Sequence, residues 1–222
     1  MNLLNLLTLL AGFAGILVVL TLLPNSWNLY RNRILFLLAI VSGPIWAFSI
    51  VFFLEVQNFE VALIYAKIIY TVSIFTAIVT YEFTRIFPYR DKFTAWEKIL
   101  VFGFSLLLLF QLWFTEEFIS SLYLVGDIKT PAFGPYYTVW LLWFAWIIGW
   151  RIYILFKKLQ SITEIAKKQT TYMIVGISIA GLGMLPTNII LPALGVYEYI
   201  WVGPFMSAIM VSVIAFVIRK TW

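Results

Sequence analysis

Long apolar stretches, separated by short polar segments, follow one another along the whole chain. A bilayer core of about 30 Å requires about 20 mostly apolar residues for each helix that crosses it. Several stretches contain one proline, which a membrane helix tolerates when its neighbours supply new hydrogen-bond partners. The pattern predicts an all-α bundle of seven membrane-spanning helices, over residues 3–23, 34–54, 61–83, 98–114, 136–156, 169–190 and 199–218.

Two connections between these segments are longer than the others. Residues 115–135 contain several glycines and prolines, which predicts a hairpin or a loop that caps the bundle. Residues 157–168 carry apolar side chains at a helical spacing between lysines. That second connection is therefore predicted to be a helical extension.

Basic residues favour one side of the predicted bundle. Thirteen of the fifteen Lys and Arg residues lie in the loops and helix ends of that side, and six of the ten acidic residues lie on the other. Lys129 is in an opposite loop, and Lys67 is inside the third segment. Because cytoplasmic loops of membrane proteins are enriched in Lys and Arg, we expect the N-terminus outside and the C-terminus in the cytoplasm.

Composition supports this class and excludes others. Hydrophobic residues make up 63% of the chain and charged residues 11%, whereas soluble domains are roughly one quarter charged. The chain lacks Cys and His, so we expect no disulfide, no metal site, no cofactor and no enzymatic activity. The net charge of +5 arises from basic residues that alternate with the apolar segments on one membrane face, while acidic residues prevail on the other face. This distribution differs from the single water-facing basic patch that a nucleic-acid surface requires. We expect residues 1–222 to form one domain.

Lys67 is the charged residue that lies well inside a predicted span. Its backbone is about 10 Å from the outer end of that helix, given a rise of about 1.5 Å per residue. It could form an ion pair with Glu55, Glu60 or Glu198, or extend toward the outer surface as an anchor. Alternatively, it could contact an anionic ligand, since an ionisable group within the membrane is a candidate functional residue.

Polar residues also interrupt the outer end of the sixth segment. Thr187 and Asn188 lie at membrane depth beside prolines, and such broken helix ends can form the edges of cavities. Together with Gln57, Asn58 and Tyr197, they could frame a ligand pocket that opens outward. The alternative is that they only cap the helix end.

At the inner end of the third segment, Glu82 and Arg85 are three residues apart and so on one helical face. We expect a local ion pair between them, with an inner-side switch element as the alternative. On the fifth segment, a series of tryptophans predicts a lipid-facing or packing surface, and Arg151 is expected to extend toward the inner interface.

Small residues at helical spacing predict close packing between helices. They occur on the first, sixth and seventh segments and include Gly12, Gly15, Gly176, Ala180, Gly183, Gly203, Ser207, Ala208 and Ser212. We expect packing seams at these positions rather than ligand walls.

The last two segments carry a set of short motifs. These are Lys167-Lys168-Gln169 leading to Gly176, then Pro186-Thr187-Asn188, Leu191-Pro192, Gly195, Gly203-Pro204 and a helix that ends in Arg219-Lys220. This set resembles the N-terminal seven-helix sensor region of bacterial and archaeal membrane histidine kinases. The layout of the earlier segments is compatible with the same family.

The resemblance implies a sensory domain in the cytoplasmic membrane of a prokaryote. It would bind a small or lipophilic ligand, act as a homodimer, and pass its signal at Arg219 and Lys220 to a kinase-type output module. Because the chain has no phospho-accepting His, that module would be a further part of a longer protein or a separate partner. The alternative function is that of a small-molecule transporter or channel, which would require polar residues through the bilayer centre.

Overall fold

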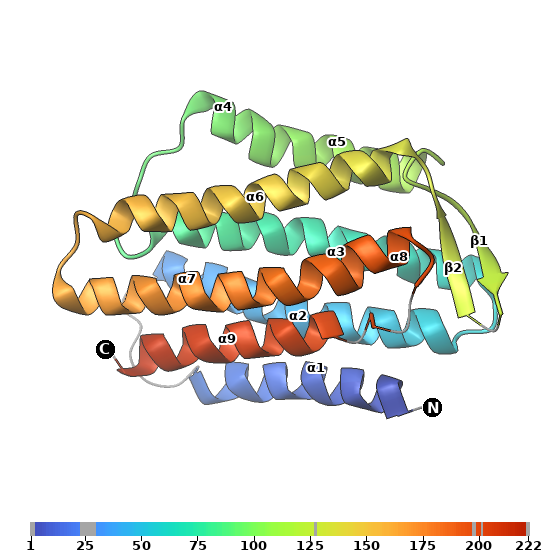
Figure 1. Ribbon diagram of the computed structural model, residues 1–222, viewed down its shortest axis with the longest axis horizontal. Coiled ribbons are helices and arrows are strands. Elements are labelled where there is room, and N and C mark those ends of the chain that lie inside the picture. Colours follow the sequence, from blue (N-terminus) through green and yellow to red (C-terminus); the bar gives the residue numbers. More distant parts are fainter. Residues whose placement is uncertain (1–2, 23–29, 127, 197–198, 201, 221–222) are drawn as a thin grey trace.

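In the computed structural model, long helices run side by side and a small hairpin covers one end (Figure 1). The structure describes residues 3–22, 30–126, 128–196, 199–200 and 202–220. The long helices are α1 (Leu3–Leu22), α2 (Tyr30–Glu55), α3 (Phe59–Ile86), α6 (Pro135–Leu159), α7 (Glu164–Leu185) and α9 (Val202–Lys220). The short helix α4 (Ala95–Lys98), the π-helical turn η1 (Ile99–Gly103) and α5 (Phe104–Phe114) follow one another directly, and η2 (Pro186–Ile190) and α8 (Leu191–Ala193) extend α7.

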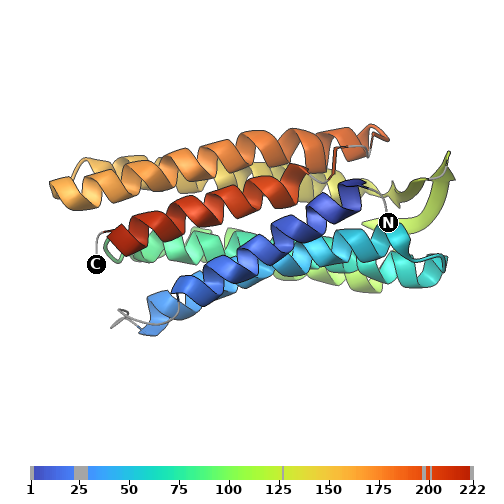
Figure 2. The same cartoon turned by 90° about the horizontal axis from the view of Figure 1, so that it is seen from below.

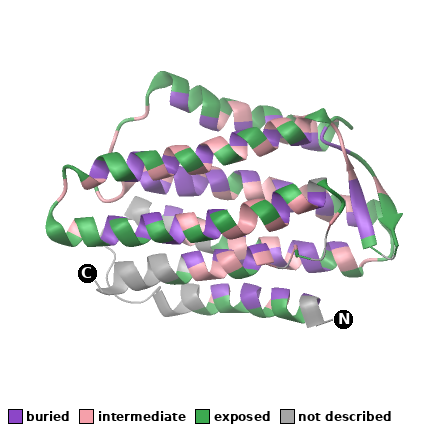
Figure 3. Ribbon diagram, in the orientation of Figure 1, coloured by how far each residue is buried: buried purple, intermediate pink, exposed green. Residues whose placement is uncertain are grey.

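Five helical stretches among the described residues are long and apolar enough to cross a membrane. They are Leu37–Glu55, Phe59–Ile86, Ala95–Phe114, Pro135–Leu159 and Glu164–Ile190. Large apolar side chains such as Phe114 and Leu182 are 76% and 77% exposed, and exposed faces lie along the outside of the bundle (Figure 3). Such a surface suits lipid rather than water, as in a multi-pass membrane protein. Seven spans and their orientation remain predictions.

The bundle has two chemically different ends. At one end, α3 and α6 finish and α4 and α7 begin, among the lysines and arginines of the connecting segments; we call this the basic end. At the other end lies the hairpin, and we call this the hairpin end. Figure 1 shows the basic end on the left and the hairpin end on the right.

The predicted hairpin is confirmed within residues 115–135. Strands β1 (Ile119–Val125) and β2 (Ile128–Phe133) pair in antiparallel fashion, with Val125 opposite Ile128. The helical bundle therefore carries a two-stranded sheet at one end, and the fold remains compatible with the predicted all-α class. The sheet forms because this segment has two short runs that contain β-branched and aromatic residues, with Gly126 in the turn between them, instead of a continuous apolar helix.

Lys129 of β2 fastens the hairpin to the end of α2. Its side chain is buried, and its ammonium group donates to the carbonyl oxygens of Leu54, at 2.9 Å, and Val56. These carbonyls lie at the C-terminus of the helix, where cations are favoured. Burial lowers the pKa of Lys129 below its ordinary value, while the nearby Glu55 carboxylate opposes that shift.

The predicted helical extension over residues 157–168 is wrong. Helix α6 ends at Leu159 and α7 begins at Glu164, with a turn between them. The Ser161 N–H donates to the carbonyl of Lys158 at 3.1 Å, and Thr163 is extended at the N-cap of α7. Ser and Thr favour such turns and caps over helix interiors, which explains the break.

The predicted packing seams are confirmed at glycines such as Gly12 and Gly15, where a neighbouring helix leaves little space for a side chain. A Cβ atom at Gly12 would lie 3.3 Å from Ala47 of α2, and one at Gly15 would lie 3.2 Å from Pro44. Helix α9 likewise packs on α7 and α1, and it lies beside α1 in Figure 2. Glycine at these positions allows the helix backbones to approach closely.

Candidate functional site

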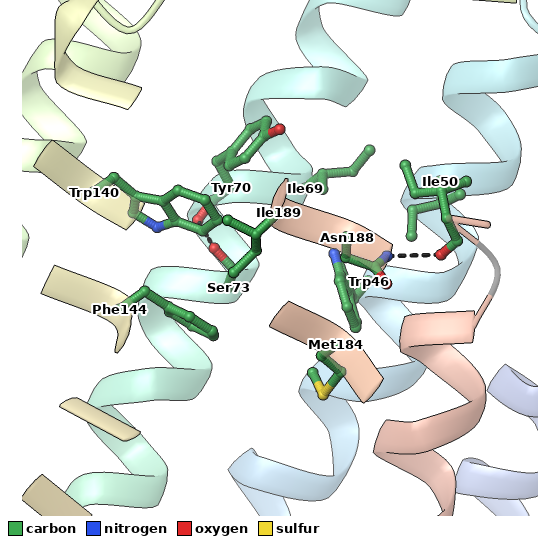
Figure 4. A pocket seen from close by; sticks show the side chains of 11 residues that line it. Trp46, Ile50, Ile69, Tyr70, Ser73, Trp140, Phe144, Met184, Asn188 and Ile189 are labelled. Atoms are coloured by element: carbon green, nitrogen blue, oxygen red, sulfur yellow. Dashed lines mark hydrogen bonds between the residues drawn. The ribbon is translucent and has the colours of Figure 1, made fainter. Parts of the chain in front are cut away.

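A small cavity lies in the hairpin half of the bundle, between α2, α3, α6 and η2 (Figure 4). Its volume is about 30 Å³, which is room for about two water molecules. The walls are mainly aromatic and aliphatic, with Ser73 and Asn188 as polar members. The lining consists of Trp46, Ile50, Ile69, Tyr70, Ser73, Trp140, Phe144, Met184, Asn188, Ile189 and Ile200.

Two hydrogen-bond donors in this wall lack an acceptor. The indole N–H groups of Trp46 and Trp140 are both buried, and neither has a partner among the described residues. The Ser73 hydroxyl donates to the carbonyl of Tyr70 at 2.8 Å, which leaves its own lone pairs available. Since buried tryptophan N–H groups usually have a partner, this wall suits a neutral occupant that carries a hydrogen-bond acceptor.

The π-helical turn η2 forms one edge of the cavity. Asn188 is buried there, and its amide N–H donates to the carbonyl of Ile200 at 2.6 Å. The Tyr137 hydroxyl donates to the carbonyl of Ile189 at 2.7 Å. These bonds attach η2 to the segment before α9 and to α6. Asn188 therefore lies in the cavity wall, as the ligand hypothesis requires, and stabilises the helix end, as the capping hypothesis requires.

The other residues predicted to frame this pocket lie elsewhere. The Thr187 hydroxyl contacts Asn188 at 2.8 Å but does not line the cavity. Gln57 is exposed after the end of α2, where its amide donates to the carbonyl of Glu55 at 3.4 Å, and Asn58 caps α3. Tyr197 lies outside the described residues. Of the residues predicted to frame the outward pocket, the cavity lining therefore contains Asn188.

Lys67 lies between α3 and α5 and not in the cavity. Its ammonium group is 6.0 Å from the ring centre of Trp113, and the Trp113 N–H donates to the Thr71 hydroxyl at 2.8 Å. The predicted ion pair with Glu55 or Glu60 is not formed, and Glu198 is outside the described residues. Glu55 instead accepts a hydrogen bond from Asn5 of α1.

An aromatic cluster connects the hairpin to the cavity. The Tyr70 ring of α3 lies 5.3 Å from Phe118 and 5.9 Å from Phe133, which flank and end the hairpin, measured between ring centroids. The same ring lies 5.0 Å from Trp140 in an edge-to-face arrangement. Such pairs hold aromatic side chains in defined orientations, so the hairpin and the cavity wall form one packed unit.

Glu97 is the centre of a second site, at the basic end. Its side chain is fully buried and pairs with Arg85 of α3. One carboxylate oxygen accepts from the Tyr81 hydroxyl at 2.8 Å and from the Trp150 indole at 2.9 Å. The other accepts from the backbone N–H and hydroxyl of Thr94, both at 2.8 Å. We call Tyr81, Arg85, Thr94, Glu97 and Trp150 the Glu97 network.

Lys158 of α6 lies beside this network and caps α3. It is fully buried, and its ammonium group lies 2.8–3.0 Å from the carbonyl oxygens of Thr84, Arg85, Phe87 and Tyr89. Asp91 lies 3.5 Å from Lys158 and 3.7 Å from Arg85. Arg151, about two helical turns earlier, is buried against Thr84, at 3.4 Å, so the prediction that it extends to the interface is wrong.

The sequence analysis named Arg85 but assigned it a different partner from those in the structure. The pairing expected from helical spacing was with Glu82, whereas the structure pairs Arg85 with Glu97 and Asp91. Thr94 and Glu97 do have the Thr-x-x-Glu spacing of a capping box, which marks the start of a helix. That local signal does not indicate that the glutamate is buried against α3 and α6, so the network was missed.

Among the described residues, no group of three or more acidic side chains could hold a metal ion. The cavity offers hydrogen-bond donors and apolar contact, and the Glu97 network offers a fully hydrogen-bonded carboxylate. These features suit ligand binding and conformational coupling.

Searches with protein-family models and with curated protein sequences found no match to this chain. Its resemblance to histidine-kinase sensor regions therefore depends on the short motifs of the last two segments.

Proposed function

We propose that the chain is a transmembrane sensory domain that binds a small neutral molecule in the aromatic cavity. The ligand would carry a hydrogen-bond acceptor, because Trp46 and Trp140 present indole N–H groups without one. A larger ligand would require movement of the wall, where Met184 has a flexible side chain. The family resemblance supports a sensory role from a separate line of argument.

One structural observation carries the proposal: α3 and α6 both extend from the cavity to the Glu97 network. Helix α3 contributes Ser73 to the cavity and Arg85 to the network. Helix α6 contributes Trp140 to the cavity and Trp150 to the network. A shift of either helix on ligand binding would change the distances around Glu97.

The proposed mechanism is a shift between two packings of the bundle. A ligand that binds one packing more tightly increases its population, without any need for a covalent step. The change would reach a cytoplasmic kinase-type output, in the same polypeptide or a partner, through the end of α9 at Arg219 and Lys220. A homodimer would bring two such outputs together.

The test combines a reporter at the basic end with a variant that fills the cavity. Gln160→Cys, labelled with an environment-sensitive fluorophore, is titrated with a series of short-chain ketones and alcohols as acceptor probes. We expect a saturable fluorescence change that Ser73→Leu abolishes, because leucine would occupy the cavity. The matched control Ser212→Leu, on an exposed face of α9, should keep the response.

Two outcomes would contradict this proposal. An equal fluorescence change in Ser73→Leu would mean that the probes bind outside the cavity. No fluorescence change in labelled Gln160→Cys would mean that ligand binding in the cavity is not coupled to the basic end. Saturable flux of the same probes into proteoliposomes would instead favour the transporter or channel alternative.

A further inference from the structure

Two adjacent pockets open at the basic end, on either side of the segment that connects α3 to α4. One has a volume of about 480 Å³ and the other about 620 Å³. Both are lined by Asp91 and Lys92, so this connection forms the wall between them. Either pocket is far larger than the aromatic cavity.

The charge that lines these pockets is mainly positive and mainly uncompensated. Asp91 and Glu97 already pair with Arg85 and Lys158. Among the described residues, four further cations line the pockets whose side chains form no ion pair with Asp91 or Glu97, and Glu82 is the third carboxylate of the lining. These four cations are Arg90, Lys92, Lys98 and Lys157.

The larger pocket also has an apolar floor, formed by Ile86, Phe93 and Phe102. It is continuous along the chain with η1 and α5, where Ile99 and Leu106 are each 68% exposed. A free phosphate ion gains nothing from an apolar floor. A phospholipid uses both parts, since its phosphate pairs with cations while its acyl chains lie along the exposed apolar helix.

We propose that the larger pocket, with Arg90, Lys92 and Lys98 around Phe93 and Phe102, binds the headgroup of an anionic phospholipid. The lipid belongs to the leaflet at the basic end of the bundle. Its phosphate lies among the three cations, and its acyl chains extend along η1 and α5. Because Asp91 joins this pocket wall to Arg85 and Lys158, the lipid also stabilises the segment that holds the Glu97 network.

Native mass spectrometry of the full chain in detergent tests this assignment, with phosphatidylglycerol and phosphatidylcholine of identical acyl chains as probes. We expect phosphatidylglycerol to bind at least tenfold more tightly. A lysine near a membrane surface contributes about 1 kcal/mol to anionic-lipid binding, or about fivefold. The double variant Lys92→Gln/Lys98→Gln should therefore weaken phosphatidylglycerol binding by about 25-fold.

The matched control is Lys167→Gln/Lys168→Gln, which removes two exposed lysines from the same end of the bundle but from neither pocket. It should change phosphatidylglycerol affinity less than about twofold. Equal losses in the two double variants would overturn the proposal in favour of diffuse surface charge. Displacement of phosphatidylglycerol by millimolar inorganic phosphate would overturn the proposal in favour of a soluble anion. Unchanged phosphatidylglycerol binding in Lys92→Gln/Lys98→Gln would show that the lipid does not bind in the larger pocket. Circular dichroism and gel filtration establish that each variant is folded.

Discussion

The buried carboxylate of Glu97 illustrates how individual side chains stabilise a charge inside this bundle. Removing a carboxylate from water costs several kcal/mol unless a cation and hydrogen bonds replace the solvent. Glu97 has all of these, from Arg85, Tyr81, Trp150 and Thr94. Its position is therefore defined by partners on two helices, α3 and α6, and on the segment before α4, which makes it sensitive to small helix movements.

Gly203 at the start of α9 is a site where one methyl group should matter. A Cβ atom there would overlap the side-chain amide of Asn188, which bonds to the carbonyl of Ile200. We expect Gly203→Ala to lower the free energy of unfolding by about 1–3 kcal/mol through overpacking. Thermal or denaturant unfolding in detergent measures this change.

Gly149 on α6 supplies the control for that substitution. A Cβ atom at Gly149 would meet nothing within 4 Å. Since alanine is favoured over glycine by about 1 kcal/mol inside a helix, Gly149→Ala should be neutral or stabilising. If Gly203→Ala behaved in the same way, the close contact between η2 and α9 would be wrong.

At the level of elements, two helix C-termini are capped by lysines from other parts of the chain. Lys129 of the hairpin caps α2, and Lys158 of α6 caps α3. The last carbonyl groups of a helix have no partner within the helix, and one ammonium group can donate hydrogen bonds to several of them. Its positive charge also interacts favourably with the negative end of the helix dipole. These lysines thus connect neighbouring elements at opposite ends of the bundle.

Lys158→Met should strongly destabilise the end of α3. The substitution leaves the carbonyls of Thr84 and Arg85 without their donor and leaves Asp91 with one cation fewer. Loss of one member of a buried charged group costs about 3–5 kcal/mol. Unfolding in detergent measures the loss, and hydrogen exchange should localise it to residues 84–91.

The adjacent Lys157 is exposed and provides the comparison. Lys157→Met removes the same charge and adds the same side chain, yet it should change stability by no more than about 0.5 kcal/mol. Similar losses for the two variants would indicate that charge at this end, rather than capping by Lys158, stabilises the fold.

At the scale of the whole molecule, the two ends differ in both charge and structure. The hairpin end has a short sheet packed on aromatic side chains, whereas the basic end has buried ion pairs and open, positively charged pockets. Helices α3 and α6 connect these ends. The orientation predicted from charge places the basic end in the cytoplasm.

The absence of cysteine from the sequence allows this orientation to be tested directly. Leu124→Cys places one thiol on the exposed face of β1, and Gln160→Cys places one between α6 and α7. In intact cells, a membrane-impermeant maleimide should label only Leu124→Cys. Gln160→Cys should react only after the cells are permeabilised.

The unsubstituted chain should remain unlabelled throughout. Labelling of Gln160→Cys in intact cells, alone or together with Leu124→Cys, would contradict the orientation predicted from the distribution of basic residues.

Much of the architecture could be predicted from the sequence, because membrane helices depend on local hydrophobicity. Apolar stretches located, within a few residues, the five helical stretches that are long and apolar enough to cross a membrane, and glycines and prolines located the hairpin. Small residues such as Gly12 and Gly183 indicated the packing seams. The break between α6 and α7 was missed, because apolar spacing alone does not weigh the preference of Ser161 and Thr163 for turns and caps.

Sites depend on which side chains meet across helices, and the sequence determined these only in part. By itself it determined the membrane class, the candidate spans, and Asn188 and Arg85 as polar residues of interest. Only the tertiary structure decided that Arg85 pairs with Glu97, that Asn188 shares a cavity with Trp46 and Trp140, and that Lys67 lies apart from it. The physical reason is that hydrophobicity and helical spacing act within a segment, whereas burial and pairing of polar groups depend on contacts between segments far apart in the chain.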